Sequence, residues 1–182
     1  DDNLAIIGGR VMPPDTNGDV DDQYFVQYVN LGWVALNKSD GSIAAGPFAG
    51  NTFWAGFGGP CQNNNAGDPI VIYDHLADRW IFSQFTPIQG SQGHQCFAVS
   101  KDGDPFPGAG ETAADQYFRY DFVVDTNGFN DYPKIGMWPD GYYMTTNHFN
   151  AALTAYTGTR ITVFDRAKML AGDPAWLRDL RL

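Results

Sequence analysis

Aspartate dominates the acidic residues of this chain, and this bias constrains the fold more than any other feature of the sequence. Twenty of the twenty-one acidic residues are aspartate, and only Glu111 is glutamate. Aspartate favours turns because its side chain bonds to nearby backbone, whereas glutamate is the better helix former. Many of the aspartates stand in segments rich in glycine and asparagine. The sequence therefore predicts an all-β protein of short strands joined by turns, whose carboxylates are suited to a hard cation such as calcium.

Short apolar and aromatic segments recur along the chain and alternate with polar turns. They group into units of roughly 40–50 residues, the size of a four-stranded β-propeller blade. The tetrapeptide Asp-Thr-Asn-Gly occurs at 15–18 and again at 125–128, which supports an internal repeat. We predict β-propeller-type blades of short antiparallel strands, about three in this chain, and the alternative is a single antiparallel sandwich with coincidental echoes. The predicted strands are 24–29, 33–36, 70–73, 80–85, 96–100, 117–123, 134–138, 142–146 and 160–164.

Helix is expected only near the C-terminus. Asp165 can cap a short helix over 166–171, and Gly172 can end it. The dipeptide Asp-Pro at 173–174 predicts the start of a second short helix. We expect its apolar face to pack on the sheet of the same chain, with docking on another chain as the alternative. That face consists of Trp176, Leu177 and Leu180.

Length and charge limit the classes of function. We expect residues 1–182 to form a single β-propeller-like domain or a propeller fragment. The net charge of −10 disfavours nucleic acid as a partner, because two polyanions repel each other. No apolar run reaches the roughly 20 residues that span a bilayer, and the N-terminal residues lack the features of a signal peptide. The chain is either cytosolic or a processed mature form, and its acidic loops and few lysines favour a secreted, extracellular protein.

Several segments share a distinctive set of motifs. They read Pro-Pro-Asp-Thr-Asn-Gly at 13–18, Gly-Phe-Gly-Gly-Pro-Cys at 56–61 and Gly-Asp-Pro-Ile-Val-Ile-Tyr-Asp at 67–74, with related segments at 77–80 and 131–140. Together they resemble a family of secreted bacterial β-propeller-like proteins of largely uncharacterised function. Members of that family look longer than this chain. The resemblance implies that these blades belong to a larger ring, whose open edges another copy would close.

The two cysteines, Cys61 and Cys96, stand in loop sequence rich in glycine, asparagine and glutamine. We predict a disulfide between them, which would contribute roughly 3–4 kcal/mol by closing a mid-sized loop. Two buried free thiols are the first alternative. A zinc site that also uses His75 and His94 is the second, although no paired metal-binding spacing supports it.

Two acidic segments, 15–22 and 125–131, have the oxygen ligands of a calcium loop. Carboxylates and amides at alternate positions can converge on one ion if the segment curls. The first segment departs from an EF-hand because Val20 stands where that loop needs glycine and a strand follows. We interpret both as calcium loops of another architecture, and the alternative is a pair of solvated acidic turns. The predicted ligands are Asp15, Asn17, Asp19, Asp21, Asp125, Asn127 and Asp131.

The tryptophans divide into predicted core and predicted surface. Trp33, Trp80 and Trp138 lie in strands and are expected to pack between blades. Trp54 lies in a segment rich in glycine, so we predict that it is exposed and binds a ligand. No catalytic residue is predicted, because the chain has no nucleophile elbow, no phosphate loop and no zinc-protease spacing.

These features favour a secreted, calcium-stabilised binding or assembly protein with an adhesive or extracellular structural role, and not an enzyme. The expected partner is a second copy, another extracellular protein or a glycan, with no nucleic acid and no membrane span. The alternative is a glycoside hydrolase, sialidase-like or other, that uses loop aspartates as its two carboxylates.

Overall fold

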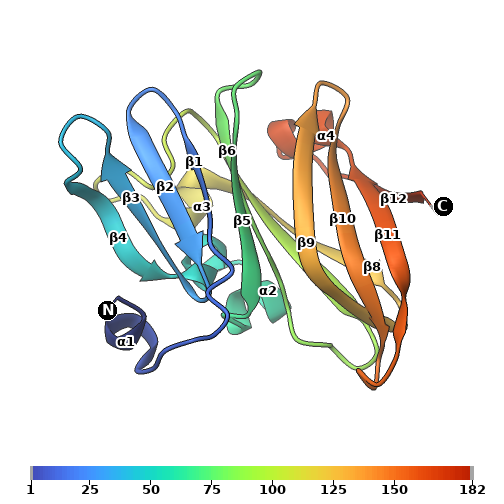
Figure 1. Cartoon of the computed structure of the whole chain (residues 1–182). Coiled ribbons are helices and arrows are strands. Elements are labelled where there is room, and N and C mark those ends of the chain that lie inside the picture. Colours follow the sequence, from blue (N-terminus) through green and yellow to red (C-terminus); the bar gives the residue numbers. More distant parts are fainter. Residues whose placement is uncertain (1, 181–182) are drawn as a thin grey trace.

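Three four-stranded antiparallel sheets make up the molecule (Figure 1). The structure, a computed structural model, describes the backbone of residues 2–180 and the side chains of 5–180, so Asp1 lies outside it. The first sheet contains β1 (Asn17–Val20), β2 (Tyr24–Val29), β3 (Gly32–Asn37) and β4 (Ile43–Ala49). The second contains β5 (Gly67–Asp74), β6 (Arg79–Phe85), β7 (Gly93–Ser100) and β8 (Tyr117–Asp125). The third contains β9 (Gly128–Trp138), β10 (Gly141–Asn150), β11 (Tyr156–Phe164) and β12 (Leu177–Leu180).

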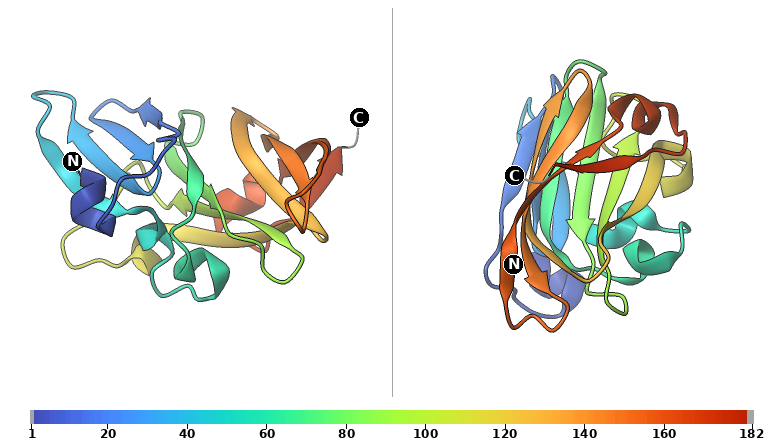
Figure 2. Two further views of the ribbon diagram at one scale, coloured as in Figure 1. Left: turned by 60° about the horizontal axis from the view of Figure 1, so that its bottom comes forward. Right: turned by 90° about the vertical axis from the view of Figure 1, so that its right-hand side faces the viewer.

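The sheets are arranged as propeller blades, which we name blade 1, blade 2 and blade 3 in chain order. Within each blade, consecutive strands pair with one another. The first strands of the blades, β1, β5 and β9, lie next to one another, and the sheets fan outward from them (Figures 1 and 2). This arrangement confirms the predicted all-β, blade-type fold. The alternative of one sandwich is wrong, because three separate sheets are present.

Each inner strand has a residue with left-handed backbone either within the strand or shortly before it. Asp15, Asp68 and Tyr132 have left-handed backbone, with φ of 39°, 46° and 49°. In blade 2, Asp68 and the following proline face a single residue of β6, and in blade 3 Tyr132 and its proline face a single residue of β10. Such bulges re-aim side chains at the end of a strand. The bulges of blades 2 and 3 thus lie at the second residue of β5 and at the fifth residue of β9.

Two aromatic cores fill the spaces between the blades. Trp80 and Phe82 of β6 belong to the cluster shared with blade 1, and Ile81 between them belongs to the cluster shared with blade 3. Alternate side chains of a strand point to opposite faces, so both faces of blade 2 are covered. Trp33 lies in the first cluster, which confirms Trp33 and Trp80 as core. The same prediction is wrong for Trp138, which is 67% exposed because it points away from blade 2.

A buried ion pair joins blade 2 to blade 3 and to the helix α4 (Arg166–Ala171). Arg166 donates from Nε and from a terminal nitrogen to the Asp74 carboxylate, at 2.6 and 2.9 Å, and the Tyr142 hydroxyl donates to it at 2.8 Å. Burial alone would raise the pKa of Asp74, but these bonds outweigh it and hold the pKa below its ordinary value. The carboxylate is therefore charged and fixed in place.

The helices agree in part with expectation. The predicted cap and end of α4 are present, since Asp165 accepts the Lys168 N–H and Gly172 is left-handed. The second predicted helix is wrong, because 177–180 instead forms β12, which satisfies the edge of β11. Short helices also occur outside the C-terminal region. They are α1 (Asp2–Ile7), the 3-10 helix η1 (Gly50–Trp54), α2 (Gly59–Asn63) and α3 (Ala113–Gln116).

No helix in the described part of the chain combines the length and apolar character needed to cross a bilayer.

Candidate functional site

The first predicted calcium segment contains β1 and uses its polar side chains to join two blades. The Asn17 Oδ1 accepts the Val71 N–H at 2.7 Å, and the Asp19 Oδ2 accepts the Tyr73 N–H at 2.8 Å. Both donors belong to β5 of blade 2. Carboxylate and amide oxygens are strong acceptors for backbone N–H groups at such a joint. These two predicted ligands therefore each have an oxygen committed to holding β1 against β5.

Asp15 and Asp131, which come from the two different predicted calcium segments, both lie near Asp68. Asn30 donates to Asp15 at 2.5 Å and accepts the Asp68 N–H at 2.8 Å. The Asp68 carboxylate accepts the Tyr132 N–H of β9 at 2.9 Å. Burial, and after it the charges of Asp15 and Asp131, raise the pKa of Asp68 to about 6, against the lowering effect of that backbone bond. We call Asp15, Asp68 and Asp131 the inner-strand carboxylates.

Asp125 is held in a separate buried network. Its carboxylate lies 2.6 Å from His148 Nδ1 and 3.0 Å from an Arg160 nitrogen, and it accepts the Asn127 N–H at 2.9 Å. These bonds outweigh burial and lower the pKa of Asp125, whereas burial lowers the pKa of His148. Thr146 completes a hydroxyl, imidazole and carboxylate chain at 2.7 Å from His148. Thr146, His148 and Asp125 are all buried. These hydrogen-bonded side chains therefore tie strands together, and a substrate has no access to them.

Asp21, the remaining predicted ligand of the first segment, anchors the β1–β2 turn. One carboxylate oxygen accepts the Gln23 and Tyr24 N–H groups at 2.6 and 2.5 Å, and the other accepts the Trp80 indole N–H at 2.9 Å. Asn127 of the second segment is exposed. The structure thus distributes the seven predicted ligands over separate places and does not gather either set around one point.

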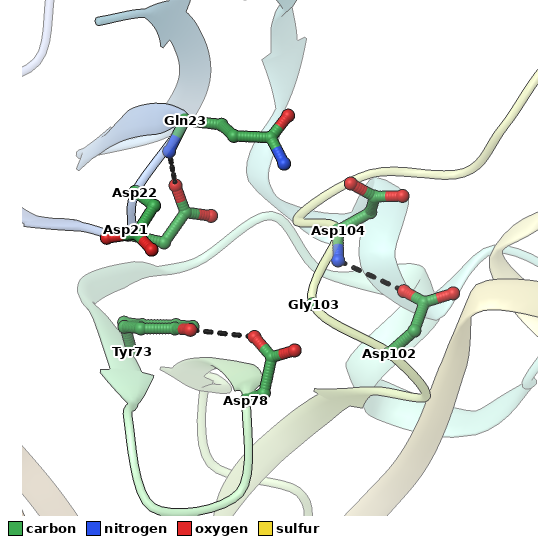
Figure 3. A pocket seen from close by; sticks show the side chains of 8 residues that line it. All are labelled: Asp21, Asp22, Gln23, Tyr73, Asp78, Asp102, Gly103 and Asp104. Atoms are coloured by element: carbon green, nitrogen blue, oxygen red, sulfur yellow. Dashed lines mark hydrogen bonds between the residues drawn. The ribbon is translucent and has the colours of Figure 1, made fainter.

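An acidic cleft lies beside that turn, between blades 1 and 2 (Figure 3). Its volume is about 280 Å³. Three segments supply carboxylates to it: the β1–β2 turn, the β5–β6 turn and the loop after β7 (Figure 3). Among the eight described residues that line it, none is lysine or arginine. The lining residues are Asp21, Asp22, Gln23, Tyr73, Asp78, Asp102, Gly103 and Asp104.

The charges in the acidic cleft act on one another. Burial and then the charges of neighbouring aspartates, Asp102 first, raise the pKa of Asp104. The Tyr73 hydroxyl donates to Asp78 at 2.7 Å, and that bond is the main reason why the pKa of Tyr73 rises to about 12. A Cβ atom on Gly103 would lie only 2.7 Å from the Asp78 carboxylate. Glycine at 103 therefore permits the turn at 102–104 to approach Asp78 closely.

Calcium stays a prediction for both acidic places. In the part of the chain that the structure describes, one group of acidic, histidine or cysteine residues has three ligand atoms within 4.8 Å of one another. That group is Cys61, Cys96 and Asp121, and it belongs to neither acidic place. The inner-strand carboxylates and the acidic cleft supply the oxygen donors that calcium prefers. Exposed side chains in the cleft would have to rotate inward to share one ion. The oxygen donors are of the kind that calcium binds, and they have to move closer together when the ion binds.

Trp54 is not the exposed binding residue that its context predicted. It is fully buried, donates from Nε1 to the Phe97 carbonyl at 3.1 Å and packs edge-on against Phe53. The glycine-rich segment folds into η1, which inserts both rings into the core between blades 1 and 2. An apolar recess of about 320 Å³ lies nearby instead, and its lining includes Trp33, Phe48 and Tyr117.

The predicted disulfide between Cys61 and Cys96 is present, so the chain has neither two free thiols nor a zinc site built on them and on His75. His75 is exposed in the β5–β6 turn. Sequence reasoning missed Asp68, Asp78, Asp102 and Asp104 as site residues. The alternation of aspartate around Gly103 was the one signal that could have identified the last two, because it matches the spacing of oxygen ligands in a turn.

Comparisons with known proteins add one finding about the chain as a whole. No model of a protein family matches it, and no curated protein matches it. Among solved structures, it is similar to the crystal structure of an exo-1,5-alpha-L-arabinanase from a bovine ruminal metagenomic library, with 15% identity and a TM-score of 0.48. The alignment covers 92% of this chain and 56% of the arabinanase chain. The chain thus spans little more than half the length of that structure.

Proposed function

We propose that this chain is a calcium-stabilised binding and assembly module of an extracellular protein. The observation that carries the proposal is the acidic cleft, where five aspartates of blades 1 and 2 surround an open space without a basic residue in its lining. Carboxylates held close together repel one another, and a divalent cation converts that repulsion into attraction. Calcium in the cleft would therefore hold the two blades together. The disulfide supports an extracellular setting, since such bonds persist in oxidising compartments.

A calcium titration tests this proposal directly. Binding to the folded chain alone raises stability by about 2.7 kcal/mol when free calcium is 100 times Kd, so the Tm should rise with calcium and fall with chelator. The double variant Asp78→Asn, Asp104→Asn should lose most of this response. Asp140→Asn, an exposed aspartate of blade 3, is the matched control and should keep it. A Tm that is the same with calcium and with chelator in the unsubstituted chain would exclude the calcium part of the proposal.

The partner that we propose is a second copy, another extracellular protein or a glycan. Blade 1 and blade 3 each have one face that no other blade of this chain covers (Figure 2). Exposed aromatic side chains such as Trp138, Tyr156 and Trp176 give such surfaces the apolar faces and polar tips on which sugars and proteins bind. The net charge of −10 makes nucleic acid an unfavourable partner.

A glycoside hydrolase is the second candidate, and the inner-strand carboxylates favour it. Glycosidases need one carboxyl group that is protonated near neutral pH and a second that is ionised. Asp68, whose pKa is raised to about 6, lies near Asp15 and Asp131. Asp15 lies two residues before β1, Asp68 is the second residue of β5 and Asp131 lies within β9, so an acid and a base from different blades would flank a glycosidic bond. In this reading Asp68 is the general acid.

Hydrolysis assays on Asp68→Asn separate the two candidates. The asparagine still accepts the Tyr132 N–H, so the variant should fold. The chain is tested on a panel of plant and bacterial polysaccharides. If it hydrolyses any of them, and Asp68→Asn reduces that rate by 100-fold or more without a change of fold, the chain is a glycoside hydrolase. If the chain releases no sugar from the panel but binds calcium in the cleft, the binding module is correct.

A further inference from the structure

Two cations line a recess at the outer edge of blade 2. Lys101 directly follows β7, and Arg119 lies in β8, the edge strand of that sheet. The recess has a volume of about 250 Å³ and shares no lining residue with the acidic cleft. None of the described residues that line it is aspartate or glutamate. We call it the cationic recess, since it is positively charged in a chain whose net charge is −10.

The charge of Arg119 is not neutralised by a carboxylate. Among the residues that the structure describes, no ion pair includes Arg119 or Lys101. Arg119 donates from one terminal nitrogen to the Ala55 carbonyl at 2.6 Å, and its guanidinium lies 5.4 Å from the centre of the Phe57 ring. Burial lowers the pKa of Arg119. A guanidinium has five N–H donors, so most of them remain for a bound anion.

Lys101 adds a second positive charge to the recess. Its Nζ donates to the Ala114 carbonyl at 2.8 Å and lies 5.2 Å from the centre of the Phe118 ring. Asp115 is close enough to feel this charge. Hydrogen bonds from Thr112, and after them the charge of Lys101, lower the pKa of Asp115. Because Asp115 is already bonded to Thr112 and lies outside the lining, it leaves the ammonium group free to bind a second anion.

Aromatic side chains form much of the remaining lining. Phe57 is 38% exposed, and Phe118 and Tyr120 are partly buried. The Tyr120 hydroxyl lies 3.2 Å from the Asp173 carbonyl at the end of α4, which holds its ring in place. The Asp173 carboxylate is paired with Lys168 at 3.4 Å and does not line the recess. Aromatic rings give a ligand an apolar surface that a small inorganic anion cannot use, whereas the C–H face of a sugar ring packs against it.

We propose that the cationic recess binds a carboxylated sugar, a uronate residue of a polysaccharide. A guanidinium and a carboxylate match in shape and form two parallel charge-assisted hydrogen bonds, and an ammonium group adds a further one. The volume lies below the roughly 300–1,000 Å³ of pockets for drug-sized ligands, so it suits a single ring. The inference rests on the proposed function in that it selects the glycan among the proposed partners. It uses neither calcium nor the acidic cleft.

Calorimetric titration with a galacturonate trimer tests the site. The titration is done with chelator present, because carboxylates bind calcium and a calcium ion could otherwise hold the trimer at the acidic cleft. We expect the trimer to bind, with an affinity that falls as salt concentration rises, since salt screens exposed charges. A neutral galactose trimer should bind at least tenfold more weakly. Acetate, which has the carboxylate without the ring, should not displace the galacturonate trimer at equal concentration.

Substitutions locate the binding. Arg119→Gln should weaken trimer binding about tenfold or more, because it removes the charge and keeps a donor for the Ala55 carbonyl. Lys101→Gln should weaken it about threefold or more, and it provides the test if Arg119→Gln does not fold. Arg178→Gln is the matched control, since it makes the same change in net charge at an exposed residue of β12, and it should bind the trimer as the unsubstituted chain does.

Three results would overturn the proposal. They are no heat of binding at millimolar trimer, equal binding of the neutral and the galacturonate trimers, and equal affinities of the folded Arg119→Gln or Lys101→Gln variant and the Arg178→Gln control. Displacement by acetate at equal concentration would likewise exclude a sugar site. None of these results alters the calcium response of the Tm. Failure of the cationic recess is therefore distinguishable from failure of the proposed function.

Discussion

At the scale of single residues, Asp68 is a partly buried carboxyl group whose neighbours are themselves acidic. Asp74 and Asp125 are more deeply buried, but Arg166 and Arg160 offset their charge. Asp68 instead faces two further carboxylates, and its pKa rises to about 6. A carboxyl group in such a place is a feature of functional sites, because ordinary folding selects against it.

Asp68 should make the folded chain less stable as pH rises. Its folded-state pKa of about 6 exceeds the unfolded value of about 3.9, so the folded chain binds the proton more tightly and loses stability between about pH 4 and pH 6. Asp68→Asn removes the charge and keeps the acceptor for Tyr132. The variant should gain about 1 kcal/mol at pH 7.5, after allowance for solvent screening of a half-exposed group, and nothing at pH 4. Urea unfolding at both pH values measures this, and an equal change at both would refute it.

At the scale of elements, polar side chains of one inner strand bind the backbone of the next. Asn17 and Asp19 of β1 accept N–H groups of β5, and Asp68 of β5 accepts an N–H group of β9. A buried N–H group without an acceptor costs about 1–3 kcal/mol. These bonds therefore fix the distance between neighbouring blades as the aromatic cores do.

Asp19 should act as a joint between strands. Asp19→Ala removes the acceptor of the Tyr73 N–H and should lower the free energy of unfolding by about 1–3 kcal/mol. Asp19→Asn keeps an oxygen at the same place and should recover most of the loss. Urea unfolding with and without chelator is the measurement. If chelator erased the difference between the variants, Asp19 would be a calcium ligand in the manner that its sequence context predicts.

The sequence was sufficient for nine of the twelve strands that the structure describes, all but β1, β4 and β12, and insufficient for the places where distant segments meet. The nine predicted strands all lie within observed ones, because period-two patterns and turn residues are local signals. β1 was missed because a four-residue strand of Asn-Gly-Asp-Val has the composition of a turn. Trp54 was misplaced because only the packing of η1 between two blades buries it. The meeting of Asp15 and Asp131 at Asp68 depends on the order of the blades, which no single segment encodes.

At the scale of the whole molecule, the three blades form an open arc with a different free face at each end (Figure 2). Trp138 of β9 marks the free face of blade 3, since its neighbour Met137 pairs with Tyr142, which points toward blade 2. Its ring is 67% exposed. A large exposed aromatic on an uncovered sheet is a common feature of protein interfaces.

Self-association through this face would make the arc a building unit of a larger ring. If a second copy packs on blade 3, Trp138→Lys should weaken association by tenfold or more, because it removes an aromatic anchor and adds a desolvated charge. The Tm of the dilute chain should stay the same, since Trp138 contributes little to the core. Sedimentation velocity over a concentration series measures the association. Leu76→Lys, at a residue of the β5–β6 turn that is exposed by 52%, is the matched control for an exposed apolar side chain outside blade 3. Equal association of the unsubstituted chain and Trp138→Lys would place the contact elsewhere, and a chain that is monomeric at every concentration would remove the second copy from the proposed partners.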